Sequence, residues 1–280
     1  MEYKIVSDST AYILKLKKVP FQSVPLKIRT DSMEYIDDEN VDIADMVNYL
    51  KTYKGKSGTA CPAPNEYLEA FRDADCVFCT TITSNLSGSY NAARIAKEDY
   101  ESANPGKRVF VIDSLSAGPE IALIIEKLEE LIISGMEYEE ICAEITKYCK
   151  KTHLIFSLEC LSNHANNGRV SHSVARIAGI LGIRLIGKAS NEGTLEPTNK
   201  ARGEKKAVEV LFENMKKLGY KGKKAIIDHC ENMEGAKKLK EKIIAEFPTA
   251  NVKIGINRAL CSFYAEKGGL LVGFEENSKY

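Results

Sequence analysis

One stretch of the sequence decides the fold class, and it reads Asp75-Cys76-Val77-Phe78-Cys79-Thr80-Thr81-Ile82 followed by Thr83-Ser84-Asn85-Leu86-Ser87-Gly88-Ser89-Tyr90. Its first half is a short apolar run, which predicts a buried strand. Its second half is rich in hydroxyl groups and leads into residues at helical spacing. This predicts a helix with Ser84 or Ser87 as its N-cap. A buried strand that passes directly into a helix is typical of parallel α/β sheets.

The same alternation extends on both sides of this stretch. Apolar runs in the first half of the chain predict strands at residues 3–6, 24–28, 76–82 and 109–112. Helical spacing predicts helices over residues 41–51, 65–73, 87–100 and 119–133. We therefore expect residues 1–150 to form an α/β domain around a parallel sheet, with hydroxyl-rich ligand loops at the ends of its strands.

The second half of the chain has strands and helices in a looser order. Strands are predicted at residues 154–156, 183–186, 224–228, 252–256 and 270–274, with a turn at residues 191–193. Helices are predicted as a pair around 161–180 and over 204–218 and 233–246. This order predicts an α+β domain over residues 151–280, with the boundary near Lys150. It leaves open whether the C-terminal strand returns to the first domain.

Length and charge restrict the class of protein. A chain of 280 residues corresponds to about two domains. With 39 basic and 39 acidic residues the chain has no surplus of positive charge for phosphates, so nucleic acid is not expected as a partner. The apolar runs are shorter than a membrane helix requires, and no apolar signal segment precedes the first strand. We expect a cytoplasmic protein with reduced thiols.

Several catalytic and cofactor motifs fail when their spacing is checked. Gly55-Lys56-Ser57 resembles the end of a phosphate loop, but Leu50 stands where that motif requires a glycine. The sequence has no GxGxxG, GxSxG or HExxH motif. We therefore expect no nucleotide cofactor and assign no catalytic residue.

The cysteine and histidine spacings do not predict a metal site. Cys76 and Cys79 form a CxxC pattern, but on a strand their side chains point to opposite faces. No two histidines have the i, i+4 spacing that places both on one helical face, and we expect them to be surface or capping residues: His153, His164, His172 and His229.

Polar side chains that follow the predicted strands form the candidate site. The helix start near Ser84 and Ser87 presents free N–H groups at the carboxyl edge of the sheet, where α/β folds bind anions. The loop over residues 57–64 adds the hydroxyl of Thr59, and Asp8-Ser9-Thr10 and Asp113-Ser114 follow two other strands. The alternative, that these residues only cap helices and turns, stays open on periodicity alone.

Seven short motifs occur in the order that is typical of the DegV family, which the chain therefore resembles from residue 3 to about residue 246. They are Ile5-Val6-Ser7-Asp8-Ser9-Thr10, Val24-Pro25-Leu26, Thr59-Ala60-Cys61-Pro62-Ala63-Pro64, Thr83-Ser84-Asn85-Leu86-Ser87-Gly88-Ser89-Tyr90, Val111-Ile112-Asp113-Ser114, Asn167-Gly168-Arg169-Val170 and Lys200-Ala201-Arg202-Gly203.

The resemblance implies a fold, a ligand and a partner. In that family an N-terminal α/β domain packs on a C-terminal α+β domain, and a long-chain fatty acid lies in a tunnel between them. Such proteins are carriers rather than enzymes, and they present the acid to the ATP-binding subunit of a fatty acid kinase. By resemblance, Thr59 and Ser87 contact the head group, Ser84 and Gly88 lie beside them, and Arg169 lies near the mouth. The resemblance implies no metal and no cofactor besides the bound acid.

The sequence departs from the family near its C-terminus. The family has a histidine at the carboxylate and a Gly-Pro-Gly before the final strand, whereas this chain has Ser262-Phe263-Tyr264-Ala265-Glu266-Lys267-Gly268-Gly269. Tyr264 aligns with the histidine. Because a tyrosine donates a hydrogen bond but is not a cation near neutral pH, head-group affinity or kinase coupling is expected to differ.

Energetic magnitudes favour a binding protein over an enzyme. Burial of about 14 methylenes supplies roughly 11 kcal/mol before association costs, whereas one or two hydroxyl hydrogen bonds supply about 1 to 3 kcal/mol. One alternative is a small-molecule hydrolase or transferase with Ser87 as nucleophile. Another is a binding module for a different apolar anion. Arg169 is equally compatible with a structural role between the domains.

Overall fold

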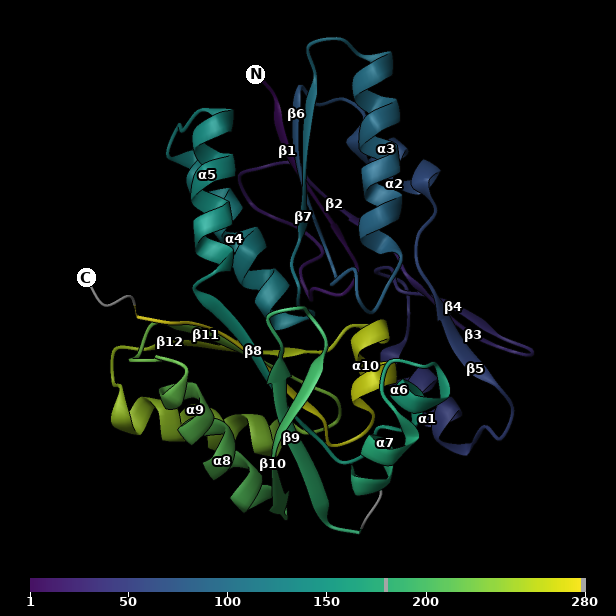
Figure 1. Cartoon of the computed structure of the whole chain (residues 1–280), viewed down its shortest axis with the longest axis vertical. Coiled ribbons are helices and arrows are strands. Elements are labelled where there is room, and N and C mark those ends of the chain that lie inside the picture. The colour runs from purple at the N-terminus through teal and green to yellow at the C-terminus, as the bar shows by residue number, and fades with distance from the viewer. Residues whose placement is uncertain (179–180, 278–280) are drawn as a thin grey trace.

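The chain forms two large sheets and one small sheet in the computed structural model, which describes residues 1–178 and 181–277 (Figure 1). The first sheet is parallel, in the order β2-β1-β6-β7. Its strands are β1 (Tyr3–Asp8), β2 (Phe21–Val24), β6 (Cys76–Thr81) and β7 (Arg108–Asp113). Every residue of β6 is buried, as is typical of a central parallel strand that is covered on both faces. The predicted parallel α/β first half is confirmed.

Helices cover both faces of this sheet (Figure 1). α2 (Pro64–Phe71) and α3 (Ser89–Ala103) cover one face, and α4 (Pro119–Ile133) and α5 (Tyr138–Cys149) cover the other. α3 begins two residues later than predicted, with Gly88 as N-cap and no side-chain cap, so the prediction of Ser84 or Ser87 as N-cap is wrong. The backbone N–H groups of Leu86 and Ser87 bond to the Thr83 carbonyl instead, which makes a turn before the helix. α5 was not predicted.

The first half of α4 is apolar on nearly all its sides because it lies between the two large sheets. The five residues 121–125 are all 0% exposed, and they pack against Phe78 of the first sheet and Ile226 of the second. A helix that is hydrophobic all round is a buried one.

The cysteine pair shows that the two faces of β6 are separate, as predicted: Cys76 packs in the cluster that contains α4, and Cys79 packs in the cluster that contains α2 and α3.

The second large sheet is mixed and has the order β10-β9-β8-β13-β11-β12. Helices α8 (Glu204–Lys217) and α9 (Met233–Glu246) pack on one of its faces (Figure 1). The C-terminal strand β13 lies between β8 and β11, so it does not return to the first sheet. The other strands are β8 (Thr152–Leu158), β9 (Ile183–Ala189), β10 (Leu195–Arg202), β11 (Lys224–His229) and β12 (Asn251–Ile256), with β13 at Leu270–Glu275.

The chain passes from the first large sheet to the second between α5 and β8. Lys150 is the C-cap of α5, and β8 begins at Thr152. We propose Lys150 as the boundary between the two domains that the sequence predicts. The α+β character of the second half is confirmed, because its sheet combines parallel and antiparallel pairs.

A small antiparallel sheet extends from the first domain beside the second (Figure 1). It contains β3 (Lys27–Thr30), β4 (Glu34–Ile36) and β5 (Ser57–Ala60), and α1 (Ile43–Thr52) follows β4. The strand predicted at 24–28 is interrupted at Pro25, which has no backbone N–H to donate to a ladder. The loop predicted over 57–64 is wrong in its first half, because residues 57–60 pair with β3.

Three short helices lie between the mixed sheet and this small sheet (Figure 1). They are α6 (Ser162–Asn166), α7 (His172–Ala178) and α10 (Ala259–Ala265). α6 and α7 correspond to the helix pair predicted around 161–180, whose predicted end lies outside the described residues. α10 was not predicted.

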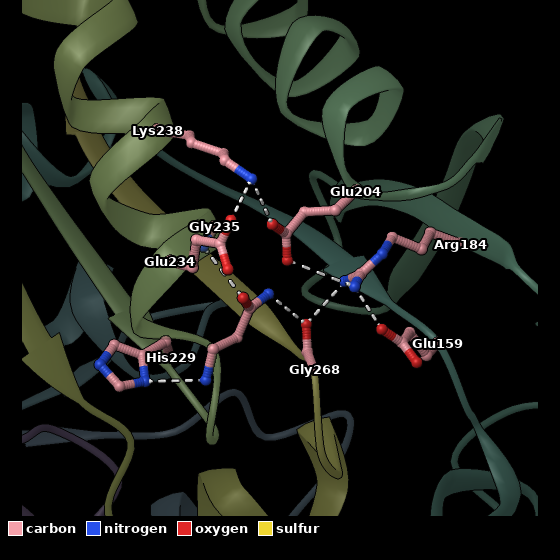
Figure 2. A network of polar contacts seen from close by, with 9 residues as sticks. Glu159, Arg184, Glu204, His229, Glu234, Gly235, Lys238 and Gly268 are labelled. Carbon is pink, nitrogen blue, oxygen red and sulfur yellow. Dashed lines mark hydrogen bonds and ion pairs between the residues drawn. The ribbon is translucent and has the colours of Figure 1, made fainter.

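A network of polar contacts ties α8, α9 and β9 together (Figure 2). Arg184 of β9 donates to the Gly268 carbonyl at 2.8 Å and pairs with Glu159 and with Glu204, the latter at 3.5 Å. Lys238 of α9 pairs with Glu204 at 3.3 Å and with Glu234 at 2.5 Å. Each charged group of this network therefore has a partner of opposite charge.

Candidate functional site

A cavity of about 320 Å³ lies between the carboxyl edge of the parallel sheet and the mixed sheet. Most of its wall is apolar and comes from both halves of the chain. Those apolar residues are Leu26, Ala60, Ile82, Leu86, Ala117, Leu154, Phe156, Leu158, Ala189, Leu195, Leu260, Ala265 and Leu271. Its volume and apolar lining are typical of small-molecule sites.

Polar residues from six segments of the chain also line the cavity. They are Thr59, Cys61, Thr83, Ser87, Ser116, His164, Arg169, Thr194, Cys261 and Tyr264. Among the described residues the lining contains no Asp, Glu or Lys, so Arg169 is the charged side chain that contributes to it near neutral pH. Cys61, Gly88 and Thr194 are exposed, which marks where the cavity reaches the surface. The electrostatics favour an anionic group on an apolar ligand.

Thr59 and Tyr264 meet in the cavity wall. The Thr59 Oγ1 and Tyr264 Oη atoms are 2.9 Å apart, which joins β5 of the small sheet to α10. Burial raises the pKa of Tyr264, and the nearby Thr59 hydroxyl and Arg169 charge act against that rise. Tyr264 is therefore a neutral hydroxyl near pH 7, and either oxygen of the pair has a proton to donate to a ligand.

The buried carboxylate of Asp37 positions the helix that carries Tyr264. It accepts hydrogen bonds from the backbone N–H groups of Ala259 and Leu260, both at 3.0 Å, at the start of α10. It also pairs with Arg258 at 3.2 Å and accepts from Ser9 Oγ at 3.0 Å. A carboxylate is favourable at a helix N-terminus, so this contact holds α10 against the first domain.

Arg169 lies in the loop after α6 and reaches across to the first domain. Its Nε donates to the Leu86 carbonyl at 3.3 Å, and a second guanidinium nitrogen donates to the Asn167 carbonyl. Among the described residues it pairs with no carboxylate. The sequence left open a structural or a functional role for this arginine. The contact with Leu86 supports the first role, and an unneutralised charge on the cavity wall supports the second.

Ser87 and Gly88 line the cavity just before α3. Ser87 Oγ lies 3.3 Å from Ser89 Oγ and accepts from the Ser89 N–H at 3.3 Å. These are weak contacts, so the hydroxyl retains capacity for a ligand. A Cβ at Gly88 would lie 2.9 Å from Cys61 Sγ, so a larger residue at this position would require the exposed Cys61 side chain to shift.

Other strand-end residues hold loops rather than line the cavity. Ser84 is exposed and is not among the lining residues, and its backbone N–H donates to Asp113 Oδ1 at 3.1 Å. Asp8 accepts from the Ile82 N–H at 2.7 Å and from Thr10 Oγ1 at 2.5 Å. Burial raises the pKa of Asp8 to about 6. The capping alternative therefore applies to Asp8 and Asp113 and not to Thr59, whereas Ser87 both accepts from the Ser89 N–H at the start of α3 and lines the cavity.

The turn between β9 and β10 closes one side of the cavity. Gly193 has φ +76°, and a Cβ there would lie 2.1 Å from Thr83 Oγ1. Asn85 Nδ2 donates to the Glu192 carbonyl at 2.5 Å, which fastens this turn to the loop before α3. Gly193 is thus required by both its backbone conformation and its contact with the first domain.

His164 is a lining residue that the sequence did not predict. It is 7% exposed, and its ring centroid lies 4.8 Å from that of Tyr264. The expectation of a surface or capping histidine is wrong here, because α6 packs its His164 face against α10. A histidine three residues after Leu161 in a short polar segment carries no sequence signal of this burial.

The described residues contain no group of three or more His, Cys, Asp or Glu side chains that could hold a metal ion. Within the same residues, no helix has both the length and the apolar character needed to cross a membrane.

Comparison with known proteins identifies relatives over nearly the whole chain. A family model described as "Uncharacterised protein, DegV family" matches residues 2–277. A DegV domain-containing protein of Streptococcus pyogenes serotype M3 is 43% identical over 279 residues, which cover 98% of this chain and 100% of the relative.

Two solved structures of similar sequence hold fatty acids. The Streptococcus pneumoniae Fatty Acid Kinase (Fak) B3 protein, loaded with linoleic acid, is 42% identical, with a TM-score of 0.97 over 99% of this chain and 100% of that chain. A DegV family protein of Eubacterium eligens, loaded with heptadecanoic acid, is 42% identical, with a TM-score of 0.96 over 98% of this chain and 100% of that chain.

Proposed function

The chain belongs to the DegV family, and from that premise we propose that it binds a long-chain fatty acid in the cavity between its two large sheets and presents the carboxylate to a separate kinase subunit. One observation carries the proposal: the cavity has an apolar wall, and its polar lining within the described residues includes an arginine and several hydroxyl groups but no acid. This combination suits a ligand with one anionic end and one long apolar end.

The proposed orientation follows from the distribution of polar groups. We place the carboxylate near Thr59, Ser87, Arg169 and Tyr264, with the chain among the leucines of β8, α10 and β13. Ser84 is omitted from this set because it does not line the cavity. The rim at Cys61 and Gly88 is exposed, so a carboxylate there is within reach of a second protein.

The binding step is tested on the purified, delipidated protein. Native mass spectrometry with heptadecanoic acid should show one acid per chain. In parallel, Cys61 is a built-in reporter, because it is exposed and lines the cavity. Bound acid should slow its alkylation by a maleimide, read by peptide mass spectrometry, while alkylation of Cys142 on α5 stays unchanged as the control. Absence of a bound acid, or equal Cys61 labelling with and without a stoichiometrically bound acid, would contradict the proposed place of binding.

The carrier role makes a separate prediction about turnover. The protein incubated with ATP, magnesium and heptadecanoic acid should form no acyl phosphate, and addition of the ATP-binding subunit of a bacterial fatty acid kinase should start its formation. Acyl phosphate formed without the second protein would refute the carrier role.

The alternative of a hydrolase with Ser87 as nucleophile needs a general base beside the hydroxyl. Among the described residues the Ser87 side chain forms hydrogen bonds only with Ser89, which is not a base. Hydrolysis of a p-nitrophenyl ester that is abolished by Ser87→Ala would support this alternative instead.

A further inference from the structure

We propose that His164 is a ligand-binding residue of the cavity, and that an imidazole N–H donates a hydrogen bond to the carboxylate of the bound fatty acid. The proposal rests on the proposed function, since it adds a head-group contact in the same cavity. It further implies that His164 makes the site select a free carboxylate over an uncharged ester.

The position of His164 places it at the polar end of the cavity. The residue lines the cavity from α6, and its ring packs against Tyr264 at a centroid distance of 4.8 Å. Tyr264 in turn is 2.9 Å from Thr59. The imidazole is therefore beside the hydroxyl pair that the head group is proposed to contact.

The side chain of His164 has no hydrogen-bond partner among the described residues. Its Nδ1 is fully buried and has no hydrogen-bond partner, and the residue as a whole is 7% exposed. Its neighbour Asn163 differs, since Asn163 Nδ2 donates to the Phe263 carbonyl at 2.7 Å. A buried polar group without a partner destabilises the folded protein by about 1 to 3 kcal/mol. Because the ring lines the cavity and neither of its nitrogens bonds to a described residue, a ligand in the cavity can supply a partner to the imidazole.

The charge state of His164 determines what it can offer. Burial, and then the nearby Arg169 charge, lower the pKa of His164 to about 3, so the imidazole is neutral near pH 7. Within the described part of the chain, Arg169 acts on the charge of His164 and Tyr264 packs against its ring, and neither group is an acid near that pH. A neutral imidazole has one N–H donor, and an ionised carboxylate only accepts, so the two are complementary.

Selectivity follows from the strength of this hydrogen bond. A donor bonds an ionised acceptor about twice as strongly as a neutral one. An ester keeps the apolar chain of the acid but offers only neutral oxygens. The contribution of His164 should therefore be large for the acid and small for its methyl ester.

The experiment measures the affinities of heptadecanoic acid and methyl heptadecanoate by displacement of a fluorescent fatty acid at pH 7.5. His164→Leu should weaken binding of the acid by about tenfold or more and leave that of the ester within about twofold. His164→Gln, which retains an N–H donor, should recover most of the acid affinity. His172→Leu, at an exposed histidine of α7 outside the cavity lining, is the matched control and should change neither. Because leucine removes an unpartnered buried polar group, the variant should unfold at no lower temperature than the wild type.

Two results would overturn the proposal while the wild type still binds the acid. One is an unchanged acid affinity in His164→Leu. The other is an equal loss of acid and ester affinity, which would mean that the ring acts only through packing. Failure of the wild type to bind the acid at all is a different result, because it contradicts the proposed function itself.

Discussion

Arg184 is buried and Arg169 is partly buried, and the groups that surround the two arginines differ. Arg184, in the network of Figure 2, donates to the Gly268 carbonyl at 2.8 Å and pairs with the carboxylates of Glu159 and Glu204. Arg169, on the cavity wall, donates only to the backbone carbonyls of Leu86 and Asn167 within the described part of the chain. The first charge is neutralised inside the protein, and the second is not.

This difference shows that an arginine can either stabilise the fold or bind a ligand, depending on the groups around it. A guanidinium that is already paired with carboxylates stabilises the fold and has little left for a ligand. A guanidinium held in position by neutral carbonyls keeps its charge and its geometry ready for an anion. Hence loss of Arg184 should change stability, and loss of Arg169 should change binding.

The largest expected effect is on stability. Arg184→Ala removes the cation that pairs with Glu159, one of the two cations beside Glu204 and one of the two donors to the Gly268 carbonyl, and it should lower the free energy of unfolding by about 3 kcal/mol. The value is set at the low end for a buried pair, since the Glu159 side chain is 47% exposed. Urea denaturation measures it. Lys238→Ala, at the exposed edge of the same network, should cost less than about 1 kcal/mol. Equal losses in the two variants would contradict the distinction between buried and exposed charges.

Glu120 extends the comparison to a buried acid without a cation. Its carboxylate accepts from Ser116 Oγ at 2.5 Å and from Thr152 Oγ1 at 2.7 Å, and burial raises its pKa from 4.5 to about 7. The folded state therefore binds this proton more tightly than the unfolded state. The stabilisation is fully present below pH 4.5 and is lost as the pH rises through 7.

Glu120→Gln tests whether Glu120 makes the folded protein less stable as the pH rises. Since the amide cannot ionise, the variant should be more stable than the wild type by about 2 kcal/mol at pH 8 and should be similar to it at pH 4.5. Thermal unfolding across this range measures the difference. Burial also raises the pKa of Asp8 to about 6 and that of Asp228 to about 7. The variant should therefore still lose some stability as the pH rises through this range. A variant that is less stable than the wild type at pH 8 would mean that Glu120 is ionised at little cost.

Arg169→Met tests the unpaired member of the comparison. Methionine keeps much of the apolar stem and removes the charge, so the affinity for heptadecanoic acid should fall by about fiftyfold. The free energy of unfolding should change by less than about 1 kcal/mol, because only neutral carbonyls lose a donor. Fluorescent displacement and urea denaturation measure the two quantities. If stability falls as much as in Arg184→Ala while affinity is retained, Arg169 is a structural residue.

Ser87→Ala removes a single hydroxyl from the cavity wall. We expect a loss of about tenfold in acid affinity, because a charge-assisted hydrogen bond to the carboxylate is deleted. Stability should hardly change, since Ser87 accepts only one long hydrogen bond from the Ser89 N–H at 3.3 Å. Unaltered affinity would show that the carboxylate lies away from α3.

The smallest expected effect is that of Tyr264→Phe. The ring that packs against His164 is kept, and only the hydroxyl that lies 2.9 Å from Thr59 is lost. Thr59 still has a hydroxyl to donate, so acid affinity should fall by only about threefold. A loss as large as that of Arg169→Met would show that Tyr264 itself is a principal head-group donor.

Elements whose signal is local were predicted from the sequence. β6 is a continuous buried run, and α9 was predicted with its observed bounds, Met233–Glu246, because its apolar positions repeat at helical spacing. α5 carried the same kind of signal, in Tyr138, Ile141 and Ile145, and the prediction did not use it. β10 carried little signal, since it is an edge strand of mostly exposed residues with a bulge at Pro197.

The sequence by itself determined the class of both large sheets, the family, and the presence of the hydroxyl groups of Thr59 and Ser87 and the guanidinium of Arg169 in short motifs. Only the tertiary structure decided which of these side chains meet. Thr59 and Tyr264 are 205 residues apart in the chain, and His164 is buried because α6 packs on α10. Periodicity reports only which face of an element is apolar. Whether a polar side chain at the end of that element is capped, paired or left free depends on the elements packed against it, and those come from distant parts of the chain.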